Sequence, residues 1–88
     1  MSHWNYRVLL RKDPDGTPFV AIHEVYYDEN GNPESWTCEP ADVSSEDVRG
    51  LMREIAWMVK AISEPVLVEG ANHKLTELAS DTSTEATK

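Results

Sequence analysis

The chain has 88 residues, with 16 Asp or Glu against 8 Lys or Arg and a formal net charge of −8 at pH 7. This length suits one small domain, and the acidic balance argues against direct binding to nucleic acid or to an anionic membrane surface, because both attract Lys and Arg. No apolar run approaches the ~20 residues that span a bilayer, and no signal-peptide pattern is present. The single Cys permits no internal disulfide. We therefore expect a cytoplasmic protein.

The chain organisation predicted from composition is one domain followed by a polar tail. We expect residues 1–70 to form a single α+β domain and residues 71–79 to add a short helix. Residues 80–88 carry no large apolar side chain and are rich in Ser and Thr. Such a segment buries too little apolar surface to fold, so we expect it to be disordered.

Two strands and a tight turn are predicted at the start of the chain. Apolar and polar residues alternate over 4–12, and residues 19–27 are rich in β-branched and aromatic types. Between them, the order Asp13, Pro14, Asp15, Gly16 is typical of a type I turn followed by a glycine bulge. This turn would place Leu10 opposite Val20 and Tyr6 opposite Glu24.

A second turn of the same kind over 28–31 predicts a third strand at 34–38. It would place Glu24 opposite Trp36. One sheet face then collects a row of residues that is apolar except for Glu24: Trp4, Tyr6, Val8, Leu10, Val20, Ile22, Tyr26, Trp36 and Cys38. A two-residue turn at Asn30 and Gly31 is the alternative, and it would move Trp36 to the other face. We prefer the first register because two independent turns then agree on one apolar face.

A long helix is predicted over about 45–62, with Ser44 as its N-cap and acidic residues in its first turn. A stripe at helical spacing is expected to cover the apolar sheet face; it comprises Val48, Leu51, Met52, Ile55, Val59 and Ile62. Pro65 ends the helix. Residues 66–68 are expected to form a fourth strand, parallel to the first, and 72–79 a short helix capped by Asn72.

The predicted architecture is therefore an α+β domain with a three- or four-stranded, mainly antiparallel sheet in β-β-β-α-β order and one long helix on one face. That order, the Pro-Asp-Gly hairpin and the acidic helix start resemble the small HicB-like domain of type II antitoxins. The resemblance covers residues 4–69 and departs from the family at 36–42, where a segment with Gly and Ser is usual. It implies an acidic, non-catalytic bacterial protein that binds a basic partner protein.

Three features are candidate binding sites. Trp57 lies about 180° around the helix from Val48, and Gly50 and Ala61 flank it, which predicts a shallow groove for the 72–79 segment or a second protomer. The second sheet face mixes apolar and polar residues, and Phe19, His23, Arg7 and Tyr27 would form its binding surface; ordinary strand preference explains it equally well. Glu24 is charged within the apolar face and is a candidate buried acid, with the Tyr6 hydroxyl and the Trp36 indole as its available partners. The alternative is that Glu24 lies at a sheet edge and stays in contact with water.

The sequence predicts no catalytic residue, metal site or cofactor. Cys38 and His23 are expected on opposite faces, where they cannot form a dyad. His3, His23 and His73 lie in separate segments without ligand spacing, and Asp28 to Asn32 resembles a calcium loop only in composition. We therefore predict a non-catalytic protein-binding module with a protein partner of basic character, or a homodimer. The alternative is a small-ligand site or enzyme built around Glu24, Tyr6 and Trp36.

Overall fold

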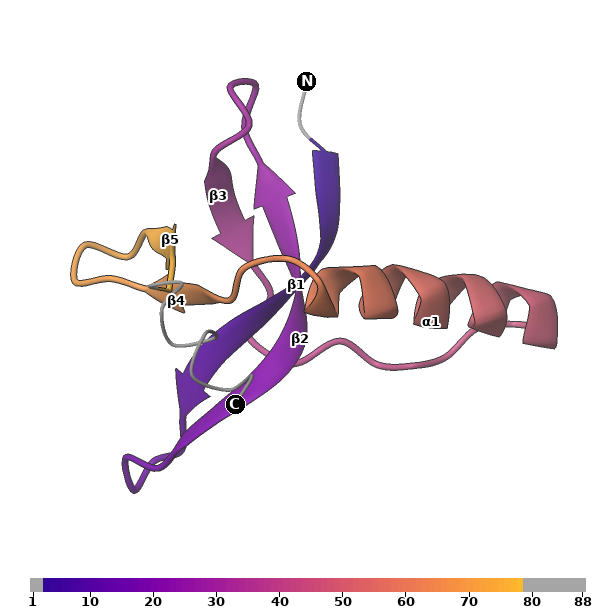
Figure 1. The fold of residues 1–88 in the computed structure, drawn as a ribbon, viewed down its shortest axis with the longest axis horizontal. Helices are drawn as coiled ribbons and strands as arrows, with labels where there is room; N and C mark the ends of the chain where they lie inside the picture. Colours follow the sequence, from indigo (N-terminus) through magenta and orange to yellow (C-terminus); the bar gives the residue numbers. More distant parts are fainter. Residues whose placement is uncertain (1–2, 79–88) are drawn as a thin grey trace.

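The computed structural model describes residues 3–78, and Figure 1 shows how the elements are arranged. In chain order they are β1 (His3–Lys12), β2 (Pro18–Tyr27), β3 (Pro33–Trp36), α1 (Val48–Ile62), β4 (Leu67–Glu69) and β5 (Leu75–Glu77). The segment 80–88, which the sequence predicts to be disordered, lies outside the described residues.

The strands form one mixed sheet in the order β3-β2-β1-β4-β5. β1 pairs antiparallel with β2 and parallel with β4, and β4 pairs antiparallel with β5. The predicted α+β fold with one long helix is confirmed, but the sheet has five strands where three or four were expected. In Figure 1, α1 projects to one side of the β1–β2 ribbon and the short β4–β5 pair to the other.

The first hairpin has the predicted register over its whole length. Leu10 lies opposite Val20 and Tyr6 lies opposite Glu24. The turn accounts for this: the Gly16 N–H donates to the Asp13 carbonyl at 2.8 Å, and Gly16 has φ of 90°, a conformation that L side chains rarely adopt. Local turn chemistry therefore set the pairing of the two longest strands.

The second hairpin begins in the predicted register and then departs from it. Its turn has the expected bond from the Gly31 N–H to the Asp28 carbonyl at 3.0 Å, and Tyr27 lies opposite Pro33. A bulge between Tyr26 and Tyr27 then shifts the pairing, so Trp36 lies opposite Val25 and not opposite Glu24. Trp36 consequently lies on the face opposite the predicted one, where it packs against a buried cluster.

The C-terminal elements confirm one prediction and correct another. β4 runs parallel to β1, with Leu67 opposite Leu9, as expected. The helix predicted over 72–79 is wrong, because residues 72–78, the described part of this segment, hold the end of a tight turn and β5. The Gly70 N–H donates to the Lys74 carbonyl at 2.8 Å, and His73 has φ of 62°. The turn brings Leu75 back over the sheet, where it is buried, and burial of this side chain outweighs the weak helix preference of a short segment.

The helix begins three residues later than predicted. Asp47, and not Ser44, is its N-cap, and the Asp47 carboxylate accepts a hydrogen bond from the Gly50 N–H at 2.7 Å. The helix ends at Ile62 as expected. Residues 63–66 alone connect it to β4, so the C-terminal end of α1 is held against the middle of β1, and the rest of the helix extends away from the sheet (Figure 1).

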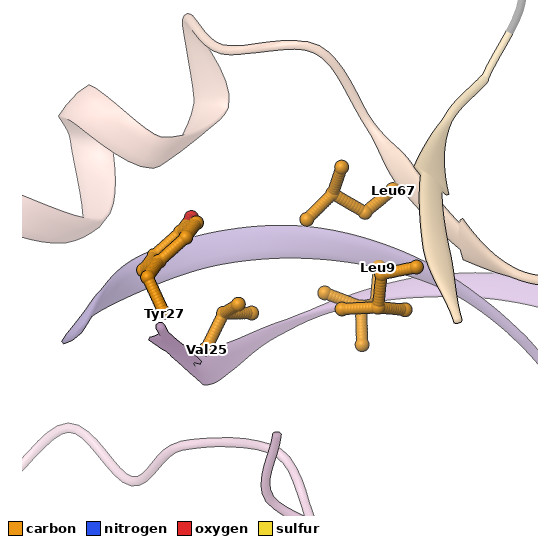
Figure 2. Close-up of a cluster of buried hydrophobic side chains, with 5 residues drawn as sticks. Leu9, Val25, Tyr27 and Leu67 are labelled. Carbon is orange, nitrogen blue, oxygen red and sulfur yellow. The ribbon is translucent and has the colours of Figure 1, made fainter. Parts of the chain in front are cut away.

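Two small hydrophobic clusters lie on opposite faces of the sheet. On one face Leu9, Val25, Tyr27, Leu67 and Leu75 are buried together, and Figure 2 shows how Leu9, Val25, Tyr27 and Leu67 lie in this cluster. Trp36 packs against the cluster. On the other face Tyr6 packs with Met58 and Ala61 of α1, beside Ile22 and Ala41. The prediction of a single apolar face covered by the helix is therefore wrong, because apolar side chains are buried on both faces of the sheet.

Candidate functional site

The apolar stripe of α1 does not face the sheet. Met58 and Ala61 make that contact, and the Tyr6 hydroxyl donates a hydrogen bond to the Glu54 carboxylate on the same side of the helix. Of the six predicted core residues of the helix, Leu51 is half-buried. The other five are largely exposed, with relative exposures of 72% for Val48, 67% for Met52, 44% for Ile55, 60% for Val59 and 66% for Ile62. We call these five residues the α1 stripe.

The exposure of the α1 stripe follows from how the helix is attached. Its C-terminal end is anchored by the short connection to β4, and the Arg7 guanidinium donates to the Pro65 carbonyl in that connection at 2.7 Å. Much of the helix then extends past the sheet (Figure 1), so a stripe that runs its whole length finds no cover within the described residues. The stripe has alternating spacings of four and three residues, which is typical of a seam between two helices. That spacing is the sequence signal that could have indicated a partner helix, whereas the sequence-based prediction assigned the stripe to the sheet face.

The predicted groove of Trp57, Gly50 and Ala61 does not form on the outer side of α1. Ala61 is buried against Tyr6, and Gly50 is buried beneath Ser45. A Cβ at position 50 would lie 2.1 Å from the Ser45 hydroxyl oxygen, so a larger residue here would force the Ser45 side chain away from the first helical turn. Trp57 is 48% exposed and lies at the margin of the sheet-facing side. Gly50 and Ala61 therefore form no exposed groove beside Trp57 on the outer side of α1.

Trp57 contributes instead to an aromatic cavity between α1 and the start of β1. The cavity has a volume of about 390 Å³ and is lined by Trp4, Asn5, Tyr6, Trp57, Lys60, Ala61 and Glu64. The rings of Trp4 and Tyr6 meet edge to face, with centroids 5.2 Å apart. A volume and an apolar lining of this kind suit a small molecule or one large side chain.

The second sheet face is a core and not the mixed binding surface considered above. Arg7, His23 and Tyr27 are all buried, whereas Phe19 is 39% exposed near the end of the hairpin. Arg7 also donates to the Tyr27 hydroxyl at 3.2 Å, and that hydroxyl donates to the Asn5 side chain at 2.8 Å. Polar residues on this face therefore bond to one another, and of the four predicted binding residues only Phe19 is accessible.

His23 is fully buried, and protein groups occupy both of its ring nitrogens. Nδ1 lies 2.9 Å from the Thr37 carbonyl and Nε2 lies 3.2 Å from the Arg11 guanidinium. A carbonyl only accepts and a guanidinium only donates, so Nδ1 carries the proton and the ring is neutral. Burial lowers the pKa of the His23 imidazole, and the Arg11 charge lowers it further, against the opposing bond to Thr37. Cys38, predicted to be buried, is exposed, and His23 has no free nitrogen to serve it as a base.

We expect the free energy of unfolding to fall as the pH is lowered from 7.5 to 5.5, because His23 gains a proton more readily in the unfolded chain. The unfolded pKa is about 6.5, so this contribution is complete above that pH and is lost as the pH approaches the lower folded pKa, at no more than about 1.4 kcal/mol per pH unit. Urea denaturation of wild type and His23→Gln over this range isolates the term, with exposed His73→Gln as the control. Parallel pH profiles for wild type and His23→Gln would contradict the proposed neutral, buried ring.

Glu24 does not bond the partners that the sequence suggested. It accepts a hydrogen bond from the Tyr26 hydroxyl, which raises the pKa of Tyr26, while Tyr6 bonds Glu54 and Trp36 lies on the other face. The predicted site of Glu24, Tyr6 and Trp36 is therefore not assembled. Glu24 and Tyr6 do share a hollow of about 410 Å³. Its lining is Tyr6, Glu24, Thr37, Glu39, Pro40, Ala41, Asp42, Ser44 and Glu54, and the four carboxylates make it an acidic surface.

Within residues 3–78, no group of three or more His, Cys, Asp or Glu is arranged to hold a metal ion. Asp28 to Asn32 forms a turn in which the Asp28 carboxylate accepts from the Asn30 and Asn32 N–H groups at 2.9 and 3.0 Å. His73 bonds Glu69 at 2.7 Å on the surface. The helix in the described part of the chain is not long and apolar enough to cross a membrane.

In comparisons with known proteins, the chain matches no protein-family model, and neither a curated protein nor a solved structure matches it. Its function is therefore inferred from its own residues. The described surface offers three features with distinct chemistry: the apolar α1 stripe, the aromatic cavity and the acidic hollow.

Proposed function

We propose that this chain is a non-catalytic protein-binding module and that the α1 stripe is its contact surface. One observation carries the proposal: five apolar side chains, each between 44% and 72% exposed, form a continuous row along one helix. Isolated apolar residues are normal on protein surfaces, whereas contiguous apolar patches mark contacts. The net charge of −8 opposes the anionic lipid surface that would be the other cover for an amphipathic helix.

Charge supports a partner of basic character elsewhere on the same module. The carboxylates of Glu24, Glu39, Asp42 and Glu54 line one hollow, and such a surface attracts and orients Lys and Arg side chains. An antitoxin-like or regulatory role toward a basic protein is the concrete form of this proposal. The resemblance of the element order to HicB-like domains favours that role.

The proposal is tested by photo-cross-linking in the cell of origin. A photoreactive amino acid is placed at Ile55 in the centre of the α1 stripe and, as a control, at Val20, an exposed apolar residue of β2. We expect polypeptide adducts from position 55 and few from position 20. An absence of polypeptide adducts at position 55, or equal yields at the two positions, would contradict a protein contact at the α1 stripe.

A second candidate function, small-ligand binding, is favoured by the aromatic cavity. Its three rings and its volume of about 390 Å³ suit a flat apolar molecule. An anilinonaphthalene sulfonate dye distinguishes the two surfaces, since it fluoresces in either apolar environment. Loss of dye fluorescence in Trp57→Ala but not in Val59→Asp would locate binding in the cavity. The opposite result would assign it to the α1 stripe.

A further inference from the structure

The α1 stripe is symmetric about its own centre to within one residue. Ile55 is the middle residue of α1, with Val48 and Ile62 seven residues before and after it. Met52 lies three residues before Ile55 and Val59 lies four after it. A second α1 helix that ran in the opposite direction would therefore place Val48 against Ile62 and Met52 against Val59, with Ile55 against itself.

We infer that a second copy of this chain covers the α1 stripe, with the two α1 helices antiparallel across a two-fold axis beside Ile55. This inference rests on the protein-binding function proposed above and names the partner. A two-fold interface requires one patch to complement itself, and the spacing of the five apolar residues meets that requirement along the whole helix. The alternating spacings of four and three also keep the seam on one side of a helix, as in paired helices.

The charges at the two ends of α1 favour the antiparallel direction. Glu46 and Asp47 precede the helix, and Lys60 lies in its last turn. Antiparallel packing brings the Lys60 end of one copy toward the acidic N-terminal end of the other. Glu64 at the same end pairs with Lys60 of its own chain at 3.8 Å, and Arg49 of the second copy lies three residues from the level of Glu64. A parallel pair would instead place each charge at the level of its own like charge.

The edge of the stripe away from the sheet is suited to close packing. Ala56 and Ser63 lie along that edge, and in the antiparallel arrangement Ala56 lies near its own counterpart while Arg49 faces the small Ser63. Small side chains at this edge let the two helix backbones approach. The interface therefore has an apolar centre with no buried charge, and its ionic groups remain at the rim.

The size of the interface sets the expected affinity. A helix of 15 residues is about 22 Å long, so the α1 stripe alone offers on the order of a few hundred Å² per chain, less than the roughly 800 Å² per partner of a standard interface. The dimer should therefore form reversibly, with a Kd in the micromolar range, and should dissociate on dilution.

Sedimentation equilibrium of the full chain, from about 1 to about 500 μM, tests the association. We expect a monomer–dimer equilibrium that Val59→Asp weakens by at least about 100-fold, because dimerisation would bury the new carboxylate. Val20→Asp is the matched control, since Val20 and Val59 are both 60% exposed. Circular dichroism establishes that both variants are folded. A monomer at every concentration, or a dimer that Val59→Asp leaves unchanged, would overturn the inference.

The direction of the helices is tested by disulfide formation in a Cys38→Ser background. Mixing Val48→Cys with Ile62→Cys should give a cross-linked heterodimer, whereas Val48→Cys alone should give little product. Efficient cross-linking of Val48→Cys with itself would overturn the antiparallel arrangement. The photo-cross-links at position 55 distinguish the dimer from the more general protein-binding function. If the chain is monomeric and position 55 gives adducts with a different polypeptide, the dimer is refuted and the protein-binding function stands. If position 55 gives no adducts, both proposals are refuted.

Discussion

Replacing Leu9 by alanine is expected to lower the free energy of unfolding by about 2–5 kcal/mol. Leu9 is 1% exposed and lies in the middle of β1, where it contacts the cluster of Val25, Tyr27 and Leu67. It lies opposite Leu67 of β4, so a cavity at this position weakens the contact that holds the C-terminal strands to the sheet. Urea denaturation followed by Trp fluorescence measures the loss, which is a large share of the stability of a domain this small.

Ile55→Ala is the control for this result, because the sequence pattern placed Ile55 in the core and the structure leaves it 44% exposed. At a concentration where the chain is monomeric, Ile55→Ala should lower the unfolding free energy by no more than about 1 kcal/mol. Equal losses for Leu9→Ala and Ile55→Ala would show that the α1 stripe faces the sheet after all, and the proposed contact surface would then be buried.

Raising the pH above 10 is expected to destabilise the domain through Tyr6. Burial and the hydrogen bond to the Glu54 carboxylate raise the pKa of the Tyr6 phenol from 10.0 to about 12. The unfolded chain therefore loses the Tyr6 proton first, and the stabilisation is complete below pH 10 and is lost as the pH rises toward 12. A difference of two pKa units corresponds to about 3 kcal/mol.

Denaturation of wild type and Tyr6→Phe across this pH range isolates the effect, since every other titrating group is common to both proteins. At neutral pH, Tyr6→Phe should cost about 1–2 kcal/mol for the lost bond to Glu54. Spectrophotometric titration should also show one tyrosine ionising near pH 12 in wild type and not in Tyr6→Phe. If the last tyrosine to ionise persists in Tyr6→Phe, the Tyr6–Glu54 contact is not what holds α1 to the sheet.

The candidate surface was only half visible in the sequence. Trp57 was correctly separated from the residues at positions 48, 52, 55, 59 and 62, and those five were correctly grouped on one side of a helix. Their environment was assigned wrongly, because periodicity shows which residues share a side and not which side meets the sheet. The contact between α1 and the sheet is made by the Met58 thioether, the Ala61 methyl group and the hydrogen bond to Glu54. No pattern in the sequence marked these three residues as the side of the helix that faces the sheet.

The sequence by itself determined the local features of this protein: the α+β class, the first hairpin with its register, the second turn, the end of α1 and the parallel position of β4. The two turns and the end of α1 depend on residues close together in the chain, such as the Asp-Pro-Asp-Gly turn or Pro65, whose backbone preferences act without the rest of the fold. The parallel position of β4 follows from the element order, because a strand reached through a crossover helix pairs parallel to an earlier strand. The bulge that turns Trp36 to the other face, the strand in place of a helix at Leu75 and the rotation of α1 were decided by tertiary structure. In these three places the local conformational preference was weak. The observed conformation is the one in which a side chain is buried against a segment distant in sequence.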